Sequence, residues 1–168
     1  MYKPKNKIAL MTYSAVLTAI ALTIFMVENQ IPALVPVPGV KLGLANIVTV
    51  YAMYSVGPAP AFMILIVRIL LGGIFSGRIV SLLYSLCGGL LCYLAMLAMR
   101  KLLAPKQIWI CSVIGAVFHN LGQILAAMAV MGTVSIIVYL PILLVSGIIA
   151  GFFTGQCAQL LVKWLGAK

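Results

Sequence analysis

Acidic residues are almost absent from this sequence: its 168 residues include one glutamate, Glu28, and no aspartate. A single carboxylate cannot form the pair that glycoside hydrolysis requires, nor the cluster that holds Mg²⁺ on a diphosphate. The only histidine is His119, which excludes a multi-histidine metal site. The sequence also contains no GxxxxGK[ST] phosphate loop and no GxSxG nucleophile elbow. These absences argue against an enzyme, and they predict neither a metal nor a cofactor.

Cysteines are few, and their spacing carries no metal or disulfide signal. All four lie inside apolar runs, and none forms a CxxC pair. We prefer to interpret the four cysteines as small apolar residues that pack inside the protein. The four are Cys87, Cys92, Cys111 and Cys157.

Charge is also scarce, because 7% of the residues are charged whereas 65% are hydrophobic. A soluble domain of this size cannot hide so much apolar surface, so the sequence predicts a protein whose solvent is lipid. The net charge of +10 would favour nucleic acid in a soluble protein. Here the cations stand at the ends of apolar runs, which favours membrane topology and contact with anionic headgroups, and no nucleic-acid partner is expected.

The apolar runs predict an all-α, polytopic membrane protein with six transmembrane helices in a single domain, 1–168. Spans of about 20 residues cross a bilayer, and the predicted second span is shorter than that. The expected spans are 8–27, about 44–56, 59–75, 79–99, 108–131 and 136–161.

Six spans place both termini on one side, and the cations indicate which side. Eight basic residues fall on the side of the termini and two on the other, so the positive-inside rule predicts cytoplasmic termini in the cell membrane. The cytoplasmic set is Lys3, Lys5, Lys7, Arg100, Lys101, Lys106, Lys163 and Lys168; the external pair is Lys41 and Arg78. Residues 1–7 would be a cytoplasmic basic tail, and 28–43 an external loop.

The segment 28–46 is the most polar and most irregular part of the chain. A membrane protein places irregular backbone of this kind where it lines a cavity and performs recognition. The segment contains Glu28, Asn29, Gln30, Lys41 and Asn46, together with Pro32, Pro36 and Pro38.

Arg68 is a charge predicted to lie near the middle of the membrane. It stands about ten residues beyond Pro58, which is roughly 15 Å along a helix. Placing a charge there costs at least about 2.5 kcal/mol, so the side chain must face the interior of the bundle and have a partner. Two interpretations stay open: a structural contact to backbone carbonyls or Glu28, or a counter-charge for an anionic ligand. On the second, Arg68 should face a polar cavity that opens outward under residues 28–43.

His119, Asn120 and Gln123 form a polar cluster in the fifth predicted span. Positions i, i+3 and i+4 share a helix face, so these side chains should point inward together. They could form interhelical hydrogen bonds, or they could line a binding cavity. Their depth is close to that of Arg68, which favours the cavity.

Ala15 and Ala19 are four residues apart in the first span. Small residues at this spacing let another helix approach closely. Packing within the bundle and docking of a partner protein are both consistent with the spacing.

Three runs resemble the bacterial membrane family named heptaprenyl diphosphate synthase component I, also called the Gx transporter family. They are PGVKLGLANIVT at 38–49, RILLGG at 68–73 and LYSLCGG at 83–89. That family is similar to the substrate-binding S components of energy-coupling-factor (ECF) transporters, which are six-helix bundles that bind a small molecule under the loop between helices 1 and 2. An AxxxA motif on helix 1 docks on a coupling subunit, and Ala15 and Ala19 match it.

The resemblance implies a subunit that captures a small anionic molecule for uptake, driven by a coupling transmembrane subunit and ATPases. The candidate binding residues are Glu28, Asn29, Gln30, Lys41, Asn46, Arg68, Arg78, His119, Asn120 and Gln123. The alternative is a non-catalytic membrane accessory subunit for heptaprenyl diphosphate or quinone synthesis, or for redox enzymes. Prenyl diphosphate synthases resemble one another in Asp-rich Mg²⁺ motifs, and this chain has no aspartate.

Overall fold

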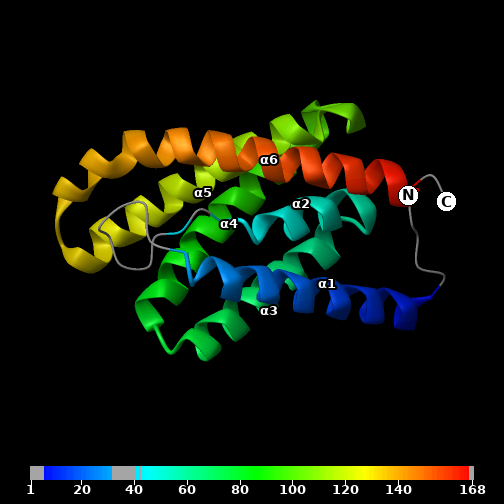
Figure 1. Cartoon of the computed structure of the whole chain (residues 1–168), viewed down its shortest axis with the longest axis horizontal. Coiled ribbons are helices and arrows are strands. Elements are labelled where there is room, and N and C mark those ends of the chain that lie inside the picture. The colour runs from blue at the N-terminus through cyan, green and yellow to red at the C-terminus, as the bar shows by residue number, and fades with distance from the viewer. Residues whose placement is uncertain (1–5, 32–40, 42, 167–168) are drawn as a thin grey trace.

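The computed structural model describes residues 6–31, 41 and 43–166, and it confirms the predicted all-α class. Six α-helices and two 3-10 helices follow one another along the chain (Figure 1). The α-helices are α1 Lys7–Glu28, α2 Asn46–Ser55, α3 Pro58–Ser76, α4 Ile79–Leu102, α5 Ile108–Met131 and α6 Leu140–Gly166. The 3-10 helices are η1 Pro105–Gln107 and η2 Val134–Tyr139.

Five of the α-helices are long and apolar enough to cross a membrane, and α2 is the exception. Of the six predicted spans, the second, which was expected to be shorter than the others, is too short to cross a bilayer core. The 10 residues of α2 extend only about 15 Å, which is half of a bilayer core. Nine of these residues are buried, so the apolar character of α2 serves contacts with protein rather than with lipid. The chain is a polytopic membrane protein built from five long helices and one half-length helix.

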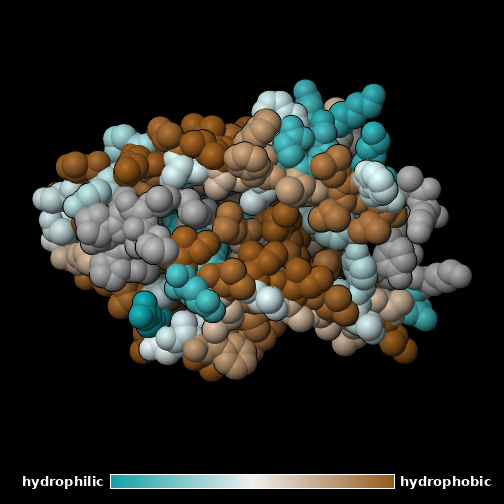
Figure 2. Space-filling view, in the orientation of Figure 1, coloured by the Kyte–Doolittle hydropathy of each residue, from teal (hydrophilic) through white to brown (hydrophobic). Residues whose placement is uncertain are grey.

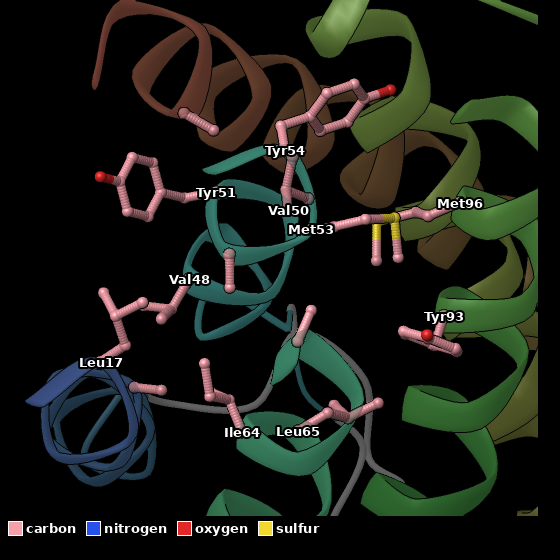
Figure 3. Close-up of a cluster of buried hydrophobic side chains, with 14 of the residues drawn as sticks. Leu17, Val48, Val50, Tyr51, Met53, Tyr54, Ile64, Leu65, Tyr93 and Met96 are labelled. Atoms are coloured by element: carbon pink, nitrogen blue, oxygen red, sulfur yellow. The ribbon is translucent and has the colours of Figure 1, made fainter. Parts of the chain in front are cut away.

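The short helix α2 lies at the centre of the bundle. It packs against α1, α3 and α6 and also touches α4 and α5. Figure 3 shows its side chains Val48, Val50 and Met53 pointing toward different neighbours, with Leu65 of α3 and Met96 of α4 among the buried residues around them.

Helices α4, α5 and α6 pack closely because glycines face the contacts. A Cβ on Gly122 of α5 would lie 2.8 Å from the carbonyl oxygen of Cys87. On α6, Cβ atoms at Gly151 and Gly155 would lie 2.8 Å and 2.6 Å from Cα atoms of α5. Small residues at this spacing let helix backbones approach in a membrane. This packing fixes the α5 face that carries the polar cluster.

The helix ends follow local chemistry. Asn6 caps α1 by accepting a hydrogen bond from the backbone N–H of Ala9 at 2.8 Å. Gly77 and Gly132 end α3 and α5 in the left-handed conformation. The last long helix begins at Leu140, later than predicted, because η2 precedes it and Pro141 suits a first helical turn.

The start of α1 and the end of α6 lie at the same end of the bundle (Figure 1). This is the arrangement expected when both termini are on one side. Which side faces the cytoplasm stays a prediction from the charge distribution. Residues 1–5 of the predicted basic tail, 1–7, lie outside the described residues.

The four cysteines are free: Cys92 and Cys111 are buried, and Cys87 and Cys157 are exposed. Cys111 donates from Sγ to the carbonyl oxygen of Met96 at 3.5 Å. The packing interpretation holds for the buried pair, whereas the other two lie on the outer surface of the bundle.

Candidate functional site

Glu28, the only carboxylate side chain, holds the loop backbone just before α2. It ends α1, is 5% exposed, and accepts a hydrogen bond at Oε1 from the backbone N–H of Gly43 at 2.6 Å. Gly43 has φ +78°, a conformation that glycine adopts without strain. A negative charge beside the first turn of α2 is also favourable for the helix dipole. Glu28 therefore anchors the loop, a role that the sequence did not predict for it.

Arg68 is buried at the middle of α3 and contacts the first residue of α2. Its side chain is 3% exposed, and Nη2 donates to Oδ1 of Asn46 at 3.2 Å. The prediction that Arg68 faces the interior is confirmed. Asn46 is neutral, so this hydrogen bond satisfies one donor without compensating the charge.

Lys41 lies at the edge of the same cluster and is half-buried. Its backbone N–H donates to Oε1 of Gln123 at 3.3 Å, and its Nζ lies 4.0 Å from the centre of the Phe25 ring. Burial lowers the pKa of Lys41 to about 8, and Arg78 and Arg68 add to the lowering, whereas the charge of Glu28 opposes it. The ammonium is mostly protonated at neutral pH and loses its charge under mildly basic conditions.

The polar cluster of α5 is buried as predicted, but its members contact different parts of the bundle. His119 lies beside the loop, since a Cβ on Gly43 would be 2.9 Å from Cδ2 of His119. Gln123 binds Lys41, whereas Asn120 donates from Nδ2 to the carbonyl oxygen of Leu143 in α6. Asn120 thus follows the interhelical interpretation, and His119 and Gln123 belong to the site.

Four buried polar atoms around this cluster have no hydrogen-bond partner among the described residues. They are Nε of Arg68, Nε2 of Gln123, Nδ1 of His119 and Oδ1 of Asn120. A buried donor without a partner costs about 1–3 kcal/mol, and more when the group is charged. Arg68 Nε and Gln123 Nε2 are donors, Asn120 Oδ1 is an acceptor, and His119 Nδ1 is one or the other according to its tautomer. The two donors, one of them charged, are suited to an acceptor with negative charge.

A small cavity lies below Asn46, toward α5 and α6. Its volume is about 10 Å³, which is close to the minimum for one water molecule. Gly43, Asn46, Ser112 and Thr154 supply its polar lining, and Ser112 Oγ and Thr154 Oγ1 lie 3.0 Å apart. Arg68 does not line it. This cavity is therefore not the open one that the sequence predicted beside Arg68, whose roof, residues 28–43, lies largely outside the described residues.

Three predicted site residues lie apart from the buried cluster. Asn29 is half-buried and Gln30 is exposed just beyond α1, and Arg78 is exposed at the N-terminal end of α4. The charge of Arg78 contributes to the lowered pKa of Lys41. The prolines at 32, 36 and 38 lie outside the described residues, as does the predicted roof over the site.

Ala15 and Ala19 lie on the outer surface of α1. Both are exposed, whereas α1 buries Leu17, Ala21, Phe25 and Glu28. At about 100° per residue, the two alanines lie more than 120° around the helix from the centre of that buried face. Packing within the bundle is therefore excluded for this pair, and its surface is free to meet lipid or another protein.

Gly43 and Gly88 are site residues that sequence reasoning did not identify. A Cβ on Gly88 of α4 would lie 2.8 Å from the carbonyl oxygen of His119 and 3.0 Å from Cγ of Gln123. Gly43 makes room for Asn46 and His119 in the same way.

A model of the heptaprenyl diphosphate synthase component I family matches residues 17–161. The match covers more than half of the chain, so the protein belongs to that family. It spans α1 through α6 and includes Glu28, Arg68 and the α5 cluster. No curated protein and no solved structure matches the chain.

Proposed function

We propose that this member of the heptaprenyl diphosphate synthase component I family is a membrane substrate-binding subunit, similar to the S components of ECF transporters. It captures a small anionic molecule from the outer side for uptake and performs no chemistry on it. The observation that carries the proposal is Arg68, a buried mid-membrane cation whose hydrogen-bond partner is the neutral Asn46.

Charge in the site supports an anionic ligand. The cluster contains two cations, Lys41 and Arg68, and one carboxylate, Glu28, which leaves one formal positive charge. The carboxylate is already engaged by the N–H of Gly43. A charge left without compensation in low dielectric is costly, and an anion bound beside Arg68 would remove that cost. Ionisable groups at this depth commonly mark substrate sites.

Access to Arg68 requires movement, because its side chain is 3% exposed. The loop is attached to α5 through the hydrogen bond from Lys41 to Gln123, which at 3.3 Å is long for an N–H···O bond. The junction before α2 is held more firmly by Glu28. We propose that the loop separates from α5 at Gln123 while Glu28 retains Gly43, which exposes Arg68 to the outer side.

Ala15 and Ala19 would dock the coupling subunit. Their exposure on α1 leaves a surface of small residues that a partner helix can approach closely. The test is affinity purification from native membranes, with the double substitution Ala15→Leu and Ala19→Leu as the matched variant. We expect the wild type to retain a transmembrane coupling subunit and ATPases, and the folded double variant to lose them. Equal recovery with both proteins would rule out this docking surface.

The family's description favours a second function, that of a non-catalytic accessory subunit for heptaprenyl diphosphate synthesis. The same affinity purification distinguishes the accessory role from the transport role. Recovery of a soluble prenyltransferase, without coupling subunit or ATPases, would support the accessory role and contradict transport.

A further inference from the structure

The small cavity below Asn46 lies where the start of α2 meets α5 and α6. Its polar lining comes from all three helices, because Ser112 belongs to α5 and Thr154 to α6, and both are buried. None of the described residues that line the cavity is charged. The hydrogen-bonding state of these three side chains therefore decides what the cavity can hold.

We infer that this cavity binds one water molecule, which accepts a hydrogen bond from Asn46 and donates to the hydroxyl pair of Ser112 and Thr154. The water joins the residue that binds Arg68 to α5 and α6. The inference concerns the surroundings of Arg68 and does not depend on the transport role proposed above.

The orientation of the Asn46 carboxamide is fixed by its partner. Arg68 has only donors, so the atom that faces its Nη2 at 3.2 Å must be the carboxamide oxygen. The nitrogen lies toward the cavity, since a Cβ on Gly43, which also lines the cavity, would be 2.9 Å from Nδ2. Among the described residues, the hydrogen bond of this carboxamide is the one at Oδ1. Nδ2 therefore offers N–H donors to a molecule in the cavity.

The two hydroxyl groups are oriented by their partners as well. Thr154 donates its proton from Oγ1 to the carbonyl oxygen of Gly151 at 3.2 Å, and a carbonyl oxygen can only accept. The 3.0 Å hydrogen bond between Ser112 and Thr154 is therefore donated by Ser112. Both hydroxyl protons are used in this way, so the pair presents oxygen lone pairs to the cavity.

A ligand of this cavity must accept on one side and donate on the other. Water does both with one heavy atom, and the volume of about 10 Å³ suits a single molecule with two to four polar partners. A bare cation offers no acceptor to Asn46 and would lie close to the charge of Arg68, which binds the same carboxamide. An anion would face the lone pairs of the hydroxyl pair. Water is the ligand that fits both sides.

A water molecule at this position is held by protein groups, because the surface of the bundle is suited to lipid. Hydrophobic side chains cover much of the face shown in Figure 2. Buried water that makes about three hydrogen bonds is part of a protein structure and is costly to remove. Here it would keep the carboxamide of Asn46 turned with its oxygen toward Arg68, and so help to position the buried cation.

The test is a crystal structure of the full chain at a resolution that shows ordered water. We expect a density peak about 2.7–3.2 Å from Nδ2 of Asn46 and at the same distance from a hydroxyl oxygen of the pair. The double variant Ser112→Ala and Thr154→Val removes both acceptors and should lose the peak. Ser81→Ala is the matched control and should keep it, because Ser81 is 3% exposed, Ser112 is 4% exposed, and Ser81 does not line the cavity.

A wild-type structure without this peak would overturn the inference, as would a peak that persists unchanged in the double variant. Crystals grown with rubidium or bromide salts distinguish water from a bound ion. A peak without anomalous signal supports water, whereas an anomalous signal at the site would show an ion and overturn the inference. If the double variant does not fold, the wild-type density and the anomalous measurement decide the question.

Discussion

Arg68 donates its hydrogen bond to Asn46, at 3.2 Å, and this contact joins the middle of α3 to the first turn of α2. Three residues earlier, Gly43 donates to Glu28 at 2.6 Å. The start of α2 is therefore held between the only carboxylate side chain and a buried cation.

Glu28→Ala should loosen the loop more than Glu28→Gln does. Alanine leaves the N–H of Gly43 without its acceptor, which costs about 1–3 kcal/mol, whereas glutamine keeps an oxygen at that position. The measurement is limited trypsin digestion, because Lys41 provides a cleavage site next to the anchored residue. Cleavage after Lys41 should accelerate most in Glu28→Ala, while cleavage after Lys106 stays constant. Equal rates at Lys41 in all three proteins would show that Glu28 does not hold the loop.

Gly43→Ala should destabilise the protein more than Gly132→Ala. Both glycines have positive φ, +78° and +65°, so both substitutions introduce backbone strain of about 1–2 kcal/mol. Only at Gly43 would the new Cβ also overlap neighbours, at 2.9 Å from Asn46 and His119. Thermal unfolding in detergent measures the difference. A Gly132→Ala variant that is the less stable of the two would contradict the close packing around Gly43.

Binding of the anion should weaken as pH rises through about 8, the lowered pKa of Lys41. Above that pH the lysine is neutral and no longer attracts the ligand.

The effect of Lys41 on folding stability has the opposite dependence on pH. The folded protein binds fewer protons at Lys41 than the unfolded chain between about pH 8 and 10.5, so this residue favours folding increasingly across that window.

The measurement for Lys41 is retention of the co-purified small molecule at pH 7 and pH 9.5. Lys41→Gln should bind more weakly at pH 7 and lose the pH dependence. A pH dependence that persists unchanged in Lys41→Gln would assign the titration to another group.

The topology is tested with single cysteines in a chain lacking Cys87 and Cys157, the two exposed thiols. Thr133→Cys, in the α5–α6 connection, should react with an impermeant thiol reagent from outside. Ala104→Cys, in the α4–α5 connection, should react only from inside. Both positions are exposed. Labelling of position 133 only from inside would invert the predicted orientation.

The sequence predicted the helices well, because hydropathy and Gly/Pro boundaries act locally. It predicted a short second span, but not that this helix is surrounded by protein rather than lipid. An apolar run is the same whether protein or lipid surrounds it, and α2 is buried by protein. The face shared by His119, Asn120 and Gln123 was also predictable from spacing, and so was the inward direction of Arg68.

The sequence could not identify the hydrogen-bond partners of the polar side chains in the site. Glu28 binds a backbone N–H fifteen residues away, and a backbone donor leaves no signal in the side-chain pattern. Arg68 binds Asn46, 22 residues earlier, whereas the sequence left backbone carbonyls, Glu28 or an anionic ligand open as its partner. Whether Asn120 faced the site or α6 depended on the orientation of α5, which the glycines of α4 and α6 determine.

The most direct test of the central claim is native mass spectrometry of the protein purified from its own membranes, compared with Arg68→Met. Methionine removes the buried charge and its desolvation cost, so the variant should unfold at a temperature at or above that of the wild type. Arg68→Lys keeps the charge as a point and should bind more weakly than arginine. We predict one small anionic molecule bound to the wild type, less of it on Arg68→Lys, and none on folded Arg68→Met. A wild type without any bound small molecule, or the same molecule retained by Arg68→Met, would contradict the account.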